Sequence, residues 1–192
     1  MKTIQYILLG IFGILTMLSC KKGENDPFIS LKTRDARITG VWELESSEEI
    51  FHYSEDSESD LVDETTTLTV EDGVQTVNSS FTITEDGSSE TFTDDPHSNS
   101  YSETYSIEKN GKYTVTYITG EYSSERTGDW DWIDTAKKKT CLLIDGMIYQ
   151  VDRLTNTELV LKIDANSKET NNPDNEEFLQ RYSITKTFKK KK

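Results

Sequence analysis

Residues that usually carry enzyme chemistry are sparse in this chain of 192 residues. The two histidines, His52 and His97, lie in polar segments and lack the spacing of a zinc-binding pair. The sequence holds no Gly-rich phosphate loop, Cys-x-x-Cys pair or Gly-x-Ser-x-Gly elbow. Cys141 opens an apolar run ending at Ile144, which favours a buried thiol over a nucleophile. We therefore expect no enzymatic activity and no cofactor.

Carboxylates are the one reactive group that is abundant, with 35 acidic residues against 21 basic ones. A glycosidase needs two carboxylates at a fixed separation, and no such pair stands out. Calcium takes oxygen ligands, and two acidic clusters could supply them: Asp56, Glu58 and Asp60, or Asp174, Glu176 and Glu177. Neither cluster has a defined calcium-loop spacing, so we favour solvated surface and expect no metal site.

The formal net charge of −14 also limits the partners of the chain. An acidic surface repels phosphate backbones, so we expect no nucleic-acid binding. The length suits a single domain after an N-terminal segment.

The N-terminus carries a motif with a specific chemical meaning. Lys2 precedes an apolar run from Ile4 to Leu18, which is shorter than the roughly 20 residues of a membrane-spanning helix and is typical of a secretory signal. The run ends in Met17-Leu18-Ser19-Cys20, which resembles the lipobox of bacterial lipoproteins. The resemblance implies a signal peptide over 1–19, lipid attached to Cys20, and a membrane as the first partner. The alternative is an ordinary secretory signal with an incidental cysteine.

Residues 20–37 are polar and predict a tether, although residues 28–34 could instead dock on the domain. Lys21 does not resemble the aspartate that retains enterobacterial lipoproteins in the inner membrane. Glu24 and Asp26 partly resemble the acidic surface-export signal of Bacteroidota lipoproteins. We expect the chain in the cell envelope, anchored to the outer membrane on its periplasmic or surface face.

From residue 38 to residue 192 the sequence alternates between apolar and polar residues. Asp-Gly or Asn-Gly pairs separate the alternating runs at 72–73, 86–87, 110–111 and 145–146, which are strong hairpin signals. This pattern predicts one all-β domain, an antiparallel up-and-down meander of eight or more strands. A barrel of about eight strands is the favoured closure, and a β-sandwich is the alternative.

Some segments depart from this pattern. Residues 54–63 and 88–100 are rich in serine and acidic residues and predict loops. A helix could lie between 165 and 177. We expect the basic residues 189–192 to form a solvated terminus. Asp134-Thr135-Ala136 resembles a short O-glycosylation sequence of Bacteroidota, with a simple turn as the alternative.

The start of the domain, Thr39-Gly40-Val41-Trp42, resembles the lipocalins, in which a Gly-x-Trp places tryptophan across the closed end of an eight-stranded barrel. The order of downstream motifs, Gly128-Asp129-Trp130 and Glu158-Leu159-Val160-Leu161 among them, is similar to that of lipocalin-like lipoproteins of Bacteroidota. The resemblance implies a basic residue late in the chain stacked on Trp42, for which Arg181 or Lys186 could serve.

Large amphipathic rings are expected to point into such a barrel: Trp42, Tyr105, Tyr113, Tyr117, Trp130 and Tyr149. An interior of eight strands holds either side chains alone or one small ligand. The rings are therefore candidate ligand-binding residues for a small hydrophobic or amphipathic molecule. The alternative is a filled barrel that acts as a structural or interaction module and contacts another envelope protein or a glycan.

Overall fold

The computed structural model describes residues 32–56, 60–85, 88–133, 139–171 and 176–192. This part of the chain forms a short helix, α2 (Arg34–Ile38), and an antiparallel sheet. Its strands are β1 (Gly40–Asp56), β2 (Asp60–Glu71), β3 (Val74–Glu85), β4 (Ser88–Thr93), β5 (His97–Ile107), β6 (Lys112–Thr119), β7 (Tyr122–Asp129), β8 (Asp131–Trp132), β9 (Cys141–Ile144), β10 (Met147–Leu154), β11 (Glu158–Asn171) and β12 (Glu176–Lys190). The prediction of an all-β antiparallel meander is confirmed.

The strand order is β7-β6-β5-β3-β2-β1-β12-β11-β10-β9-β8, with β4 paired to β3. β1 also pairs with β5, where Gly40 lies opposite Ile107 and Glu43 opposite Thr104. Backbone pairing therefore closes a ring only through β1, β2, β3 and β5. A closed barrel of about eight strands is not confirmed, and β7 and β8 stand at the two ends of the strand order.

Local turn chemistry fixes the hairpins. Asp72-Gly73 and Asp145-Gly146 both have positive φ at each residue, 49° and 75° in the first pair and 52° and 77° in the second. Two consecutive positive φ values are those of the type I′ turn, which matches the twist of the flanking strands. The Asp-Gly signals therefore identified these hairpins correctly, while the pair at 86–87 lies outside the described residues.

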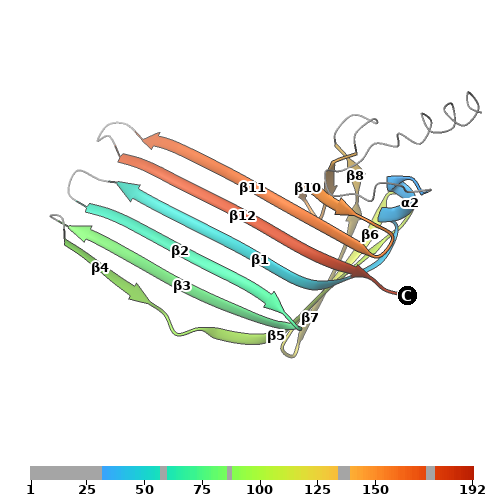
Figure 1. Ribbon diagram of the computed structural model, residues 1–192, viewed down its shortest axis with the longest axis horizontal. Helices are drawn as coiled ribbons and strands as arrows, with labels where there is room; N and C mark the ends of the chain where they lie inside the picture. Colours follow the sequence, from blue (N-terminus) through green and yellow to red (C-terminus); the bar gives the residue numbers. More distant parts are fainter. Residues whose placement is uncertain (1–31, 57–59, 86–87, 134–138, 172–175) are drawn as a thin grey trace, which may run out of the picture.

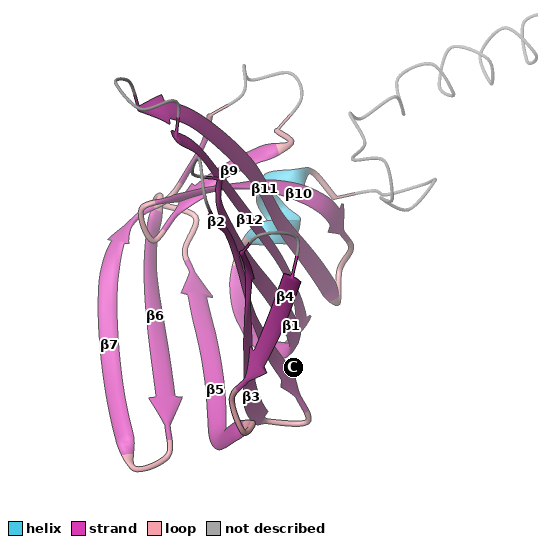
Figure 2. Ribbon diagram, turned by 90° about the vertical axis from the view of Figure 1, so that its left-hand side faces the viewer, coloured by secondary structure: helices cyan, strands magenta, loops and turns pink. Residues whose placement is uncertain are grey.

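The sheet has two unequal parts. We call the wing the layer formed by β2, β3 and β4 with residues 46–56 of β1, 163–171 of β11 and 176–184 of β12. Figure 1 shows the wing as a single layer that extends away from the other strands and α2. Figure 2 shows β5, β6 and β7 forming a second layer at a steep angle to it. The core lies between that layer and the strands near the root of the wing.

The core residues come from both layers and from α2. Sixteen buried hydrophobic side chains form one cluster: Ile38, Trp42, Tyr105, Ile107, Tyr113, Val115, Trp130, Leu142, Ile144, Tyr149, Val151, Leu154, Leu159, Leu161, Ile184 and Phe188. Only Ile184 among them lies in the wing, so the wing itself has no second layer over it within the described residues.

The two predicted loops are largely strands. β1 continues to Asp56 and β2 begins at Asp60, while β4 and the start of β5 occupy most of 88–100. Backbone pairing needs no apolar side chain, and threonine is well suited to strands. Hydroxyl pairs join neighbouring strands there, with 2.9 Å between the Thr82 and Thr91 side-chain oxygens. The prediction of loops was wrong because it relied on polarity alone.

The end of the chain also differs from expectation. β11 and β12 pair along their whole lengths, so the described residues between 165 and 177 are strand rather than helix. β12 includes Lys189 and Lys190, so the first two of the four basic residues at the terminus belong to the sheet. In the part of the chain that the structure describes, no helix has the length and apolar character needed to cross a bilayer.

Candidate functional site

Helix α2 seals one end of the core. Thr33 caps the helix, since its Oγ1 accepts a hydrogen bond from the Ala36 backbone N–H at 3.2 Å. Arg34 and Arg37 are buried and donate to the backbone carbonyls of Val151 and Leu154. Residues from Thr33 onward, within the predicted tether, therefore belong to the folded domain.

Trp42 lies fully buried beside this helix and donates from Nε1 to the Ile38 carbonyl at 2.6 Å. The cation over its ring is Lys190, with Nζ 4.8 Å from the ring centroid. Lys190 also donates to the carbonyls of Arg37 and Thr39. Burial, together with the nearby charge of Lys32, lowers the pKa of Lys190.

The predictions of Arg181 or Lys186 for this role were wrong. Lys190 is the direct cross-strand partner of Trp42, whereas Arg181 lies opposite His52 far along the wing. The register between β1 and β12 shifts between Leu44 and Ser46, and this shift could not be read from the sequence.

The six predicted ligand-binding rings all turn toward the core. Trp42, Tyr105, Tyr113, Trp130 and Tyr149 are buried, and Tyr117 is partly buried against the same cluster. They pack against other side chains: the centroids of Tyr105 and Phe188 are 5.6 Å apart in an edge-on arrangement, and those of Trp130 and Trp132 are 6.3 Å apart. These rings contribute to a packed interior, and their binding of a ligand stays a prediction.

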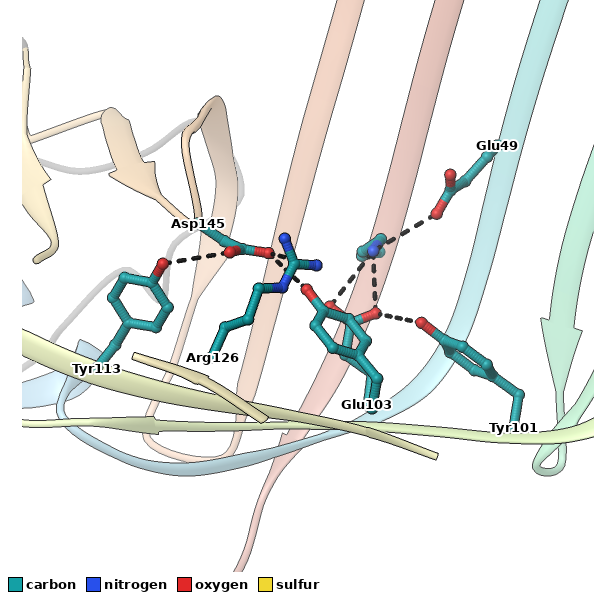
Figure 3. A network of polar contacts seen from close by, with 8 residues as sticks. Glu49, Tyr101, Glu103, Tyr113, Arg126 and Asp145 are labelled. Carbon is teal, nitrogen blue, oxygen red and sulfur yellow. Dashed lines mark hydrogen bonds and ion pairs between the residues drawn. The ribbon is translucent and has the colours of Figure 1, made fainter. Parts of the chain in front are cut away.

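A polar network lies where the core meets the wing, as Figure 3 shows. Lys186 Nζ is 2.9 Å from Glu103 Oε2 and 3.4 Å from Glu49 Oε1. The Tyr101 hydroxyl donates to Glu103 Oε2 at 3.1 Å. The Glu103 side chain is 0% exposed and that of Lys186 is 10% exposed, so this ion pair is nearly removed from water.

The sequence contained a signal for this network that was not used. Glu103 and Lys186 occupy inward positions in otherwise apolar alternations, between Tyr101 and Tyr105 and between Ile184 and Phe188. A buried charge requires an opposite charge nearby. Two inward charges of opposite sign could therefore have been identified as buried polar positions, although not as partners of each other.

Burial and charge both shift the pKa values of the groups in this network. Burial, the largest influence, would by itself lower the pKa of Lys186, but its acidic neighbours, Glu103 foremost and then Tyr149 and Glu49, together outweigh burial, and the pKa is raised. Burial, followed by the charge of Glu103, raises the pKa of Tyr101 and of Tyr105. Burial, opposed by Lys186, raises the pKa of Tyr149 to about 12. Lys186 is thus held as a cation, which makes it a poor nucleophile.

A second set of contacts surrounds Asp145, at the tip of the β9–β10 hairpin. Its carboxylate accepts hydrogen bonds from Tyr113 at 3.2 Å and Tyr117 at 2.6 Å, and Arg126 Nη2 lies at 3.4 Å (Figure 3). Arg126 belongs to β7, an edge strand of the sheet. Side-chain contacts therefore bridge from the hairpin tip to β6 and β7, where backbone pairing does not close the sheet.

The other candidate residues lie apart from this network. His52 Nδ1 is 3.1 Å from Thr65 Oγ1 and 3.5 Å from Asp63, on the side of the wing away from the core. His97 is exposed, and Cys141 is half-buried. Within the described residues, no group of three His, Cys, Asp or Glu side chains could hold a metal ion.

Several predictions fall outside what the structure describes. Cys20 and Thr135 lie outside the described residues, and so do Glu58 and Asp174, one member of each acidic cluster. The lipid anchor, the glycosylation motif and the calcium alternatives therefore stay predictions.

The wing has two chemically different faces. Paired residues on neighbouring strands share a face, so the register assigns each side chain to one side of the wing. We call the inner face the side that carries Ile184 and Lys186 and thus continues the core. Its described residues include Glu49, Phe51, Val62, Glu64, Leu68, Val77, Phe81, Ile83, Glu90, Phe92, Ile163 and Tyr182. The outer face is dominated by threonine and serine, such as Thr67, Thr82 and Thr91.

Three aromatic rings on the inner face are substantially open to solvent. Phe51, Phe81 and Phe92 are 39%, 40% and 41% exposed. Phe81 and Phe92 stack on each other across β3 and β4, with their centroids 4.8 Å apart. An open layer of this kind normally buries its apolar side against another element.

Comparison of the chain with protein-family models gave no match. Comparisons with curated proteins and with solved structures gave none either.

Proposed function

We propose that this chain is a non-catalytic interaction module of the cell envelope. Its packed core serves as a scaffold, and its binding surface is the wing rather than an internal pocket. The observation that carries this proposal is the contrast between the two parts. The six rings that could have lined a pocket pack into the core, whereas phenylalanines of the wing are about 40% exposed on one face.

Membrane attachment is part of the proposal. The lipobox-like Met17-Leu18-Ser19-Cys20 supports lipid on Cys20 and a place at the outer membrane. Mass spectrometry of the native chain should give an N-terminal Cys20 carrying acyl groups. A mature chain that keeps its first 19 residues, or begins at another position, would refute the anchor without affecting the binding role.

A lipocalin-like architecture, closed as a barrel of about eight strands, is the finer fold that we propose for the compact end. Two features support it: Gly40-x-Trp42 at the first strand, and Lys190 over the Trp42 ring. Closure would require β7 to approach the β8–β9 end of the sheet. In place of backbone pairing, the side-chain contacts of Asp145 with Tyr117 and Arg126 connect the β9–β10 hairpin to β6 and β7.

A second candidate function is binding of a small amphipathic ligand at the polar network. It is favoured by the hydroxyls of Tyr101 and Tyr182 near Lys186, at the border between the core and the wing. A ligand there would have a polar group on the network and an apolar part on the inner face. Small-molecule sites usually bury roughly 70–90% of the surface of the ligand. An open face cannot enclose a ligand to that extent. We therefore rank this function second.

Native mass spectrometry of the protein extracted gently from its own host separates the two functions. The interaction module predicts a complex with a second macromolecule and no stoichiometric small-molecule adduct beyond the lipid on Cys20. A reproducible small adduct on the folded chain, lost on unfolding, would overturn the first proposal and support the ligand-binding one.

A further inference from the structure

We infer that the inner face of the wing docks a cationic, amphipathic segment of a partner protein. This inference rests on the proposed function and names its surface and its partner chemistry. Three observations lead to it: the arrangement of apolar side chains, the excess of negative charge, and the size of the open face.

The apolar side chains form rows across the strands. Tyr182 pairs with Phe51 near the root of the wing, and Ile163, which is partly buried, lies beside the buried Ile184. Phe81 pairs with Phe92 toward its outer edge. These rows form two apolar strips that an amphipathic partner can contact. The aromatic rings on the face also attract cations.

The charges of the face are nearly all negative. Glu49, Glu64 and Glu90 lie on it, and Glu103 approaches it from β5. Lys186 is the one cation among the side chains described on this face, and it already contacts both Glu49 and Glu103. Glu64 and Glu90 are exposed. A partner that covers the face must therefore bring positive charge, because burying carboxylates without a counter-ion is costly.

The dimensions favour a protein segment over a small molecule. The wing is six strands wide, and strands lie about 4.8 Å apart, which gives roughly 24 Å across. Residues on one face repeat about every 6.8 Å along a strand, so four rows span roughly 20 Å. A helix of about 10 Å diameter, or a hairpin, fits this area.

A second copy of this chain fits the face less well. Two inner faces packed about a two-fold axis would bring two acidic surfaces together, and the one cation described on each, Lys186, already contacts Glu49 and Glu103. Like charges facing one another are unfavourable. An anionic lipid surface is repelled for the same reason.

The test uses the mature chain of residues 20–192 with Cys20→Ser, which removes the lipid and the need for detergent. The probe is a synthetic amphipathic helical peptide of leucine and lysine, labelled for fluorescence anisotropy. A peptide of leucine and glutamate with the same pattern is its matched control. We expect binding of the lysine peptide only.

Two pairs of variants locate the site. Glu64→Gln with Glu90→Gln should weaken binding about fivefold or more, taking roughly 0.5–1 kcal/mol for each charge contact. Glu48→Gln with Glu71→Gln makes the same change of net charge on the outer face and should leave the affinity within twofold. Phe81→Ser with Phe92→Ser should weaken binding, and Thr82→Ser with Thr91→Ser should not.

Several results would overturn the inference. Equal weakening by the inner and outer glutamate pairs would mean attraction to net charge alone. Preference for the glutamate peptide, or no binding of either peptide, would refute the assigned partner chemistry. Sedimentation showing a dimer that Phe81→Ser with Phe92→Ser dissociates would assign the face to a second copy. A native protein complex whose contacts avoid the wing would refute this inference while leaving the proposed function standing.

Discussion

The buried pair of Glu103 and Lys186 gives a quantitative test of how the core is held together. Lys186→Met removes the cation that is paired with Glu103, a carboxylate whose side chain is 0% exposed. Glu103 would then keep the hydrogen bond from the Tyr101 hydroxyl at 3.1 Å. Breaking one partner of a buried pair typically costs about 3–5 kcal/mol of unfolding free energy. We expect Lys186→Met to lower the free energy of unfolding by an amount in that range.

The opposite deletion should cost less. Glu103→Met leaves Lys186 with Glu49 at 3.4 Å and 10% of its side chain exposed. The charge therefore remains partly compensated, and we expect a loss of about 2–3 kcal/mol, below the range for an unpaired buried charge. The double variant, Glu103→Met with Lys186→Met, removes both charges of the buried pair, and Glu49, which loses Lys186, is 25% exposed. The double variant should therefore be within about 1 kcal/mol of the original chain.

Urea unfolding followed by tryptophan fluorescence at pH 7 measures all four chains of this cycle. Lys162→Met is the matched control, because Lys162 pairs with Asp152 at the surface and is 44% exposed. It should change stability by less than about 1 kcal/mol.

The non-additivity of the two single losses is the readout of the cycle. Additive losses in the double variant, or a Lys186→Met variant no less stable than the control, would refute the account of a coupled buried pair.

Three further predictions follow from the structure. Lys190→Met removes the cation over the Trp42 ring and two carbonyl contacts and should cost about 1–2 kcal/mol, whereas Lys189→Met, which loses only an exposed ion pair, should cost less than about 0.5 kcal/mol by thermal unfolding. Asp145→Asn should lower stability by about 1–2 kcal/mol, and no change in urea unfolding would exclude a structural role for its contacts. Lys186 and Tyr149 keep protons in the folded chain that the unfolded chain releases near pH 10, so their stabilisation is complete below pH 10 and should decline toward pH 12. For Tyr149 the full effect is about 2–3 kcal/mol, and a stability that is flat from pH 9 to 11.5 would contradict it.

Local signals in the sequence predicted much of the fold. Asp72-Gly73 and Asp145-Gly146 form the expected turns because a type I′ turn depends mainly on its own two residues. The inward position of Trp42 followed from alternation and is confirmed by its complete burial. The segment 88–100 was assigned wrongly because strand pairing on an open layer tolerates polar residues on both faces.

Features that depend on long-range pairing could not be predicted. The position of Lys190 opposite Trp42 depends on the long-range pairing of β1 with β12, including a one-residue register shift between Leu44 and Ser46. The pair of Glu103 and Lys186 joins residues separated by 83 positions, and alternation alone does not reveal which inward charges meet. The incomplete ring and the wing arise from the lengths of the paired strands. Those lengths were not predicted, because the polar segments 54–63 and 88–100 have the composition of loops.

The central claim, that the inner face of the wing is the interaction surface, is tested most directly by photo-crosslinking in intact cells of the host. A photoreactive phenylalanine analogue replaces Phe81 or Phe92 on the inner face, and Thr82 or Thr91, adjacent in sequence, on the outer face. We predict a discrete crosslinked protein of one mass from both inner positions and none from the outer positions. Equal crosslinking from the two faces, or none from the inner one, would contradict the account.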